Sequence, residues 1–291
     1  MQFNPAQIND SQQMAERLEL TRILEQALLY PHFQPIINLQ TGHLFGYEAL
    51  IRGPEDSPLH RPYALFQAAL QAGRELELEH LCRQRSLEVF AQLGSDATLF
   101  LNVSAAWLAS PAHQPGFTLD LLRRLGIPQQ QVVIELSEQH PFDTSGLTRR
   151  AVEHYRSMGF RIAIDDLGTG YSDLKLWSEL QPEYVKIDQH FIRDLDRNPV
   201  KREFVRSIAR IGRSLRCQVL AEGIEQMSEL RALQALGIPC GQGYLLGYPQ
   251  VRPEVALMPQ QIRPPLHRRS GQAFRRAFWS RLPGRSLLGL D

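Results

Sequence analysis

Short apolar runs alternate with segments of helical periodicity along most of this chain. Runs of this length bounded by turn residues are typical of strands, and apolar positions that recur every three to four residues are typical of helices. The strand-like runs are Phe33–Gln40, Leu44–Arg52, Thr98–Val103, Gln131–Leu136, Arg161–Ile164, Tyr184–Ile187, Gln218–Ala221 and Gly243–Leu246. Helical periodicity marks residues 64–93, 147–158, 202–215 and 227–236. This alternation predicts an α/β fold with a parallel sheet, and the number of units favours a closed barrel.

Only Thr41-Gly42-His43 separates the first two strand-like runs, which is typical of a hairpin turn. These two runs therefore pair in opposite directions, whereas the later runs are linked by helical segments. We predict a modified TIM-type (β/α)8 barrel with an antiparallel first strand. A lead-in helix that ends before Pro31 precedes the barrel.

Six of the strand-like runs end on a residue that can bind a metal or move a proton. The C-terminal ends of barrel strands meet at one rim, where β/α barrels collect their chemistry. Five of the six endings carry carboxylate or carboxamide oxygens, which Mg²⁺ and Mn²⁺ prefer as ligands. One carboxylate after a strand is often a helix cap, but a whole series is not explained in that way. The series predicts a site for divalent cations formed by Glu48, Asn102, Glu135, Asp165, Asp166 and Glu222, with Lys186 beside it.

The adjacent pair Asp165 and Asp166 requires an irregular backbone. Neighbouring side chains on a strand point to opposite faces, so both carboxylates can reach one site only where the strand has ended. Gly168-Thr169-Gly170 follows at once, and its glycines permit backbone conformations that other residues avoid. We therefore expect a loop that presents both carboxylates together. The glycine spacing matches neither a P-loop nor a dinucleotide fingerprint.

Length and composition suit one large domain with two extensions. Barrels of about 250 residues commonly form one domain, and this chain has 291 residues, of which 43% are hydrophobic. We expect a flexible N-terminal segment at residues 1–14, the barrel at residues 15–258 and a basic Pro/Arg-rich tail or linker at residues 259–291. From residue 262 onward the net charge is +6, which leaves −5 of the total of +1 for the preceding part. An acidic body argues against binding of DNA or RNA duplexes.

The three cysteines and the absence of long apolar runs indicate a cytoplasmic location. Cys82, Cys217 and Cys240 are odd in number and lack short paired spacings, so the sequence favours neither a disulfide framework nor a zinc site. No signal segment and no run of about 18 apolar residues is present. We expect a cytoplasmic protein, or the cytoplasmic part of a larger membrane-associated one.

Eight motifs together make the chain similar to one family. In order they are FQPI (33–36), YEALIR (47–52), LNVS (101–104), IELSE (134–138), IDDLGTGYSDL (164–174), VKID (185–188), AEGIE (221–225) and GQGYLLG (241–247). The three letters EAL occur often by chance, but eight motifs in one order and at similar intervals do not. Over residues 15–258 the chain resembles the EAL-domain family of cyclic di-GMP phosphodiesterases. The resemblance implies a bacterial signalling enzyme that hydrolyses cyclic di-GMP to linear 5′-pGpG.

The resemblance also assigns roles to the acidic residues. It implies that two ions, Mg²⁺ or Mn²⁺, are bound, the first of them by Glu48, Asn102, Glu135 and Asp165. Asp165 would bridge to the second ion, which Asp166 and Glu222 help to position. Two such ions can hold a phosphodiester for in-line attack by water. Lys186, Glu222 and Glu48 would act in catalysis, and the sequence leaves open whether Glu222 is a ligand or a proton acceptor.

Further residues correspond to the substrate pocket and to a dimer loop of similar proteins. The substrate positions are Gln34, Leu50, Arg52, Asp188, Glu225, Gln242 and Tyr244. Glu138 would steady a loop containing Gly168 and Gly170 that couples the site to a homodimer interface. Similar proteins usually carry upstream sensory or cyclase domains, so the resemblance implies such a domain if this chain is a fragment.

Two other functions remain open at this point. A catalytically silent cyclic di-GMP receptor fits the same motifs, although such receptors usually lose metal ligands that are all present here. A barrel glycosidase would use a pair of carboxylates such as Glu135 and Glu222. That function would leave Asn102, the two adjacent aspartates and Lys186 without a role.

Overall fold

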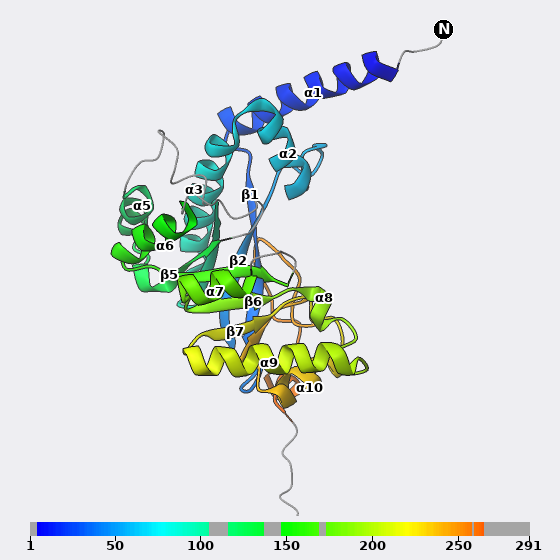
Figure 1. Ribbon diagram of the computed structural model, residues 1–291. Helices are drawn as coiled ribbons and strands as arrows, with labels where there is room; N and C mark the ends of the chain where they lie inside the picture. Colours follow the sequence, from blue (N-terminus) through cyan, green and yellow to red (C-terminus); the bar gives the residue numbers. More distant parts are fainter. Residues whose placement is uncertain (1–4, 105–115, 137–146, 169–172, 258, 265–291) are drawn as a thin grey trace, which may run out of the picture.

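The computed structural model describes residues 5–104, 116–136, 147–168, 173–257 and 259–264. Eight strands form a closed barrel in sequence order, and helices surround it (Figure 1). The strands are β1 (Tyr30–Asn38), β2 (Leu44–Arg52), β3 (Thr98–Val103), β4 (Val132–Leu136), β5 (Arg161–Leu167), β6 (Tyr184–Ile187), β7 (Gln218–Ala221) and β8 (Cys240–Gly241). The helices are α1 (Pro5–Glu25), α2 (Pro62–Ala72), α3 (Glu75–Leu93), α5 (Phe117–Leu125), α6 (Leu147–Ser157), α7 (Asp173–Leu180), α8 (Gln189–Ile192), α9 (Pro199–Leu215), α10 (Met227–Leu236) and α11 (Pro259–Ile262), and a 3₁₀ turn spans Gln129–Gln131.

Strand β1 runs against the direction of both of its neighbours. It pairs with β2 through eight register pairs, from Tyr30 opposite Arg52 to Ile37 opposite Leu44. It also closes the barrel against β8, where Asn38 lies opposite Cys240. Strands β2 to β8 are parallel to one another. The predicted TIM-like barrel with an antiparallel first strand is therefore confirmed.

Several elements differ from their predicted bounds; β1, for example, is Tyr30–Asn38 and not residues 33–40. The helical stretch predicted over residues 64–93 is two helices, because Gly73 adopts a left-handed conformation with φ of 64° and ends α2. Strand β5 continues to Leu167, past the end predicted at Ile164. The last strand is Cys240–Gly241 and not residues 243–246, which instead form a turn.

Helices extend past both boundaries predicted for the barrel, at residues 14 and 259. Helix α1 begins at Pro5, and proline is favoured in the first turn of a helix because its missing N–H would have no partner there. Beyond residue 258, helix α11 packs on the barrel. Its Ile262 is fully buried, and Arg231 donates hydrogen bonds to the carbonyls of Ile262 (2.9 Å) and Arg263 (2.7 Å). The first residues of the predicted tail thus belong to the folded unit.

Two apolar layers hold the barrel together. An outer layer packs the strands against the surrounding helices, and its largest fully buried members include Trp177 and Phe33. An inner layer fills the barrel itself with Ile36, Phe100, Val133, Ala163, Tyr184, Leu220 and Cys240. A third cluster, around Leu20 and Ile23, packs α1 against α2 and α3 at one end of the molecule (Figure 1). Within the described residues, no helix combines the length and apolarity that a membrane span requires.

Candidate metal centre and active site

The predicted metal ligands form one polar layer directly above the apolar filling of the barrel. Side chains of a strand alternate between its two faces, so a residue and the second one after it face the same way. Four of the six predicted ligands, and Lys186, lie two positions after a member of the inner apolar layer. These pairs are Phe100 and Asn102, Val133 and Glu135, Ala163 and Asp165, Tyr184 and Lys186, and Leu220 and Glu222. The fold therefore collects the predicted residues at the C-terminal end of the barrel interior.

Lys186 is the centre of this layer. Its side chain has 0% exposure, and its Nζ contacts the carboxylates of four residues from four different strands or strand ends. The contacts are Glu135 at 2.5 Å, Glu222 at 2.7 Å, Asp165 at 3.0 Å and Glu48 at 3.2 Å. A buried ammonium is costly unless it is paired. The four carboxylates satisfy that requirement, and the predicted placement of Lys186 beside the acidic set describes this arrangement.

Burial and mutual repulsion shift the protonation of the cluster. Burial raises the pKa of the Glu135 carboxyl well above its usual value, although Lys186 opposes the shift. Burial and the neighbouring Asp165 raise the pKa of Glu222 in the same way. For Asp166 the same two causes raise the pKa to about 6. Burial alone would lower the pKa of Lys186, but the surrounding carboxylates raise it well above its usual value. The lysine therefore stays charged while the acids compete for protons.

Asp165 and Asp166 reach the site by a device that differs from the predicted loop. Both residues lie within β5, where the register with β6 shifts between Ile164 and Leu167. Asp166 has a positive φ of 55°, and its backbone N–H donates to the Oδ1 of Asp165 at 2.9 Å. A bulge of this kind inserts a residue into a strand and redirects its side chain. The bulge, and not the end of the strand, lets two consecutive carboxylates face one site.

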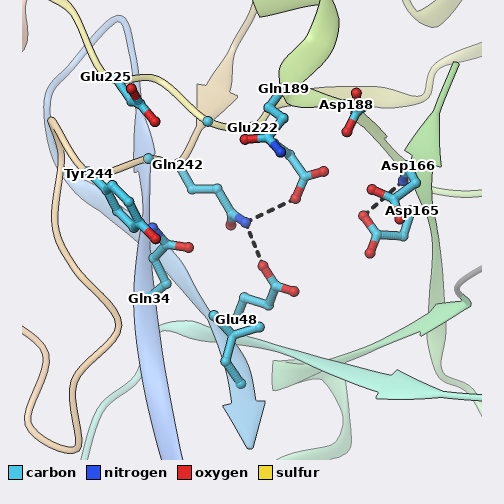
Figure 2. A pocket seen from close by; sticks show the side chains of 13 residues that line it. Gln34, Glu48, Asp165, Asp166, Asp188, Gln189, Glu222, Glu225, Gln242 and Tyr244 are labelled. Atoms are coloured by element: carbon cyan, nitrogen blue, oxygen red, sulfur yellow. Dashed lines mark hydrogen bonds between the residues drawn. The ribbon is translucent and has the colours of Figure 1, made fainter. Parts of the chain in front are cut away.

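Two amide side chains connect the acidic residues across the barrel. The Nδ2 of Asn102 donates to Glu48 at 3.3 Å. The Nε2 of Gln242 donates to Glu48 and, at 3.0 Å, to Glu222 (Figure 2). Gln242 follows β8, so these hydrogen bonds join the second strand of the barrel to its last two strands. Glu48 is thereby fixed by neighbours on both sides.

A cavity of about 310 Å³ opens above this layer. Its lining includes ten residues of the predicted metal and substrate sets, which are Gln34, Glu48, Leu50, Asp165, Asp166, Asp188, Glu222, Glu225, Gln242 and Tyr244. Figure 2 shows Gln34 and Tyr244 on the opposite side of the cavity from Asp165 and Asp166. Six of the seven predicted substrate positions therefore line the cavity, and their role in binding stays a prediction.

Arg52 is the seventh member, and it does not line the cavity. Its Nη1 donates to the carbonyl of Ile51 at 2.8 Å. It is the second residue after Leu50 and the last residue of β2, so its side chain faces the same side of the strand as Leu50 but lies closer to the strand end. Burial lowers the pKa of Arg52, while Tyr244 and Glu48 oppose the shift. The guanidinium therefore lies near the outer rim of the site, turned toward its own backbone.

Sequence reasoning did not single out three further lining residues, Gln189, Gly223 and Gly243. The two glycines have backbone reasons to be glycine. A Cβ on Gly223 would lie 2.4 Å from the Cβ of Gln189, and one on Gly243 would lie 2.2 Å from the backbone of Ile224. Both glycines belong to motifs that the sequence displays, so the motifs themselves were the available signal.

Of the predicted dimer-loop residues, only Gly168 can be placed. Its φ is +113°, a backbone conformation that residues with a side chain rarely adopt, and a Cβ there would lie 2.1 Å from the ring of Phe191. A larger residue would therefore strain the backbone and also clash with Phe191. Glu138 and Gly170 lie outside the described residues. Their predicted roles stay predictions.

The acidic layer suits divalent cations. Carboxylate oxygens of Glu48, Glu135 and Asp165 lie within 4.8 Å of one another, and so do those of Asp165, Asp166 and Glu222. Asp165 belongs to both groups, which is the arrangement expected of a ligand shared by two ions. Both Glu135 oxygens are buried without a hydrogen-bond donor among the described groups, apart from the ion pair with Lys186. Hard oxygen donors in this number fit Mg²⁺ or Mn²⁺.

Comparisons with known proteins identify the family of this chain. The model of the EAL domain matches residues 17–249. The Escherichia coli protein named cyclic di-GMP phosphodiesterase PdeR is 31% identical over 79% of this chain, which corresponds to 35% of that protein. The solved BlrP1 from Klebsiella pneumoniae, in complex with calcium and cyclic di-GMP, is 29% identical with a TM-score of 0.72, over 78% of this chain and 58% of that one.

A second solved structure matches almost over its full length. It is a standalone EAL protein from Vibrio cholerae with bound cyclic di-GMP, 30% identical, with a TM-score of 0.70 over 80% of this chain and 97% of that one. The chain spans about a third of the length of the curated relatives it matches over most of its sequence. Its fold, its acidic layer and the match over residues 17–249 lead to one conclusion: the chain belongs to the EAL domain family, the family of cyclic di-GMP phosphodiesterases.

Proposed function

We propose that this chain hydrolyses cyclic di-GMP to linear 5′-pGpG with the help of two divalent ions. The observation that carries the proposal is that two clusters of three carboxylate residues share Asp165, which lines the cavity. The relatives bound to cyclic di-GMP support the choice of substrate. A barrel glycosidase would not need the shared aspartate or the buried lysine, so the geometry does not favour that function.

Charge balance supports two ions and not one. Glu48, Glu135, Asp165, Asp166 and Glu222 carry −5 when all are ionised, and Lys186 carries +1, so the layer sums to −4. Two divalent cations offset this charge. Asn102, Glu48, Glu135 and Asp165 would hold one ion, and Asp165, Asp166 and Glu222 would hold the other. When bound, such a pair supplies stabilisation of the attacking and departing oxygens of a phosphodiester and lowers the pKa of water.

The chain's own side chains would supply position and proton transfer. Lys186 Nζ contacts four carboxylates, three of which line the cavity, and its charge would offset the negative charge that develops on a phosphate bound there. Glu222 borders the cavity, where its carboxylate can hold the second ion or accept a proton. Gln242 holds Glu48 and Glu222 together through its amide.

The decisive experiment uses the purified chain with cyclic di-GMP and Mg²⁺ or Mn²⁺, with products followed by chromatography. We expect pGpG to form, and EDTA to abolish its formation. Asp165→Asn should lose the activity by more than about 100-fold, because it removes the ligand common to both ions. Asp120→Asn is the matched control, since Asp120 lies on the surface of α5 with 68% of its side chain exposed.

The result also separates the receptor from the enzyme. Binding of cyclic di-GMP that persists in EDTA, without pGpG in either metal, would replace the proposal with a catalytically silent receptor. If the chain shows no binding and no turnover of cyclic di-GMP, this nucleotide is rejected as the ligand.

A further inference from the structure

Two tyrosine rings stack on one turn at the rim of the cavity. The backbone N–H groups of Leu246 and Gly247 both donate to the carbonyl of Gly243, at 2.9 and 3.0 Å, which makes a single helical turn. Tyr244 lies in this turn, and Tyr248 directly follows it. Tyr244 and Tyr248 are four apart, and their ring centroids are 4.6 Å from one another with an angle of 20° between the ring planes.

The barrel holds this turn in place from several sides. Gly243 lies against the backbone of Ile224, and the N–H of Leu245 donates to the carbonyl of Ile224 at 3.0 Å. A Cβ on Gly247 would lie 2.4 Å from the Pro35 ring, so the turn also packs closely on β1. The position of the turn is therefore set by the fold. The two rings that extend from it are the adjustable part.

Only one of the two rings borders the cavity. Tyr244 lines it, whereas Tyr248 does not. The two rings cover one face of each other, yet Tyr244 remains 51% exposed and Tyr248 56% exposed. An exposed aromatic side chain on a turn would otherwise sample several rotamers, and ordering it on ligand binding would weaken the affinity. Stacking against Tyr248 restricts the Tyr244 ring before a ligand arrives.

We propose that Tyr248 is a positioning residue that holds the Tyr244 ring as a flat platform for a purine base. The inference rests on the proposed function, because it takes cyclic di-GMP as the ligand. Phosphates are drawn to the cation site around Asp165, and Tyr244 lies across the cavity from it (Figure 2). The base end of the ligand is thus the part that reaches Tyr244. The amide of Gln34 beside the ring can bond the edge of a base.

The test is a double-mutant cycle over Tyr244 and Tyr248, with kcat and KM for cyclic di-GMP measured for each variant. Tyr248→Ala should raise KM about threefold to tenfold and change kcat less than about twofold, a size typical of one aromatic pair. Tyr248→Phe keeps the stack and should restore the KM. Tyr63→Ala, on α2 with Tyr63 78% exposed, controls for loss of a surface tyrosine.

The cycle isolates the action of Tyr248 through Tyr244. In a Tyr244→Ala background, Tyr248→Ala should have no further effect on KM. An unchanged KM in Tyr248→Ala, or an effect of equal size in the Tyr244→Ala background, overturns the proposal. Thermal melting of each variant confirms that it is folded.

The inference can fail separately from the proposed function. If the wild-type chain binds cyclic di-GMP without producing pGpG, the enzymatic proposal fails, and calorimetric dissociation constants replace KM in the same cycle. We expect the dissociation constants to show the same coupling between Tyr244 and Tyr248. A chain that does not bind cyclic di-GMP overturns both proposals.

Discussion

Replacing Lys186 by methionine should make the stability of the protein depend steeply on pH. Lys186 is fully buried and contacts four carboxylates between 2.5 and 3.2 Å. Methionine has a similar length and no charge, so the substitution leaves a buried acidic cluster without its cation. Removing one partner of a buried ion pair typically costs about 3–5 kcal/mol in the free energy of unfolding.

The pH dependence has a definite sign. Burial already raises the pKa of Glu135 and Glu222 above the unfolded values, and loss of Lys186 removes the charge that opposes the shift. A carboxyl whose folded pKa is raised destabilises the folded state as pH rises from its unfolded pKa toward its folded pKa. If the variant holds one additional proton, its stability relative to the wild type falls by about 1.4 kcal/mol per pH unit. Between about pH 5.5 and 7.5 the relative loss is then about 3 kcal/mol.

Urea unfolding of both proteins at these two pH values, in EDTA, measures the effect. Lys175→Met is the matched control, because the Lys175 side chain is 77% exposed and its pair with Glu179 on the surface contributes little. The control should match the wild type within about 1 kcal/mol at both pH values. Equal losses for Lys186→Met at both pH values would refute the electrostatic reasoning. So would a variant as stable as the control.

Three further outcomes follow from the site. Glu135→Gln should reduce the rise in melting temperature caused by Mn²⁺ and lower pGpG formation by more than about tenfold, measured by thermal shift and chromatography. The affinity for Mn²⁺ should fall below about pH 6, because Asp166, with a pKa of about 6, is then protonated and cannot bind the ion; titrations on either side of that pH measure this. Gly243→Ala should lower the melting temperature more than Gly73→Ala, because a Cβ on Gly243 would meet backbone at 2.2 Å while Gly73 has nothing within 4 Å.

The regular part of the barrel could be predicted from the sequence because local patterns and the fold agree there. The bounds predicted for β2, β3, β6 and β7 match the structure. These strands are buried and bounded by clear turn signals. The antiparallel first strand was predictable as well, because a three-residue turn cannot contain a crossover.

The irregular part could not be read in the same way. The bulge at Asp166 depends on pairing with β6, a contact between segments about twenty residues apart that no local pattern contains. The Tyr-Leu-Leu segment at residues 244–246 has strand-like composition, but it closes a helical turn because Gly243 adopts a φ of +155°. Gly73 ends α2 within a continuous helical pattern, since a helix tolerates glycine until tertiary packing favours a break.

The choice of candidate ligands followed from the sequence more readily than their arrangement. Strand ends predicted which residues converge, because all barrel strands but the first share one direction. They did not predict that Lys186 would contact four carboxylates, or that Arg52 would turn to its own backbone. Both depend on side-chain rotamers and on charges from other strands.

The closure between β1 and β8 gives the barrel a seam. Only two register pairs join these strands, at Ile37 and Asn38, whereas eight join β1 to β2. Amide protons along the seam should therefore exchange with deuterium sooner than those between β1 and β2. Gln242 follows the seam directly and donates a hydrogen bond to Glu48, so each transient opening there would release a proposed cation ligand while the remainder of the barrel stays folded.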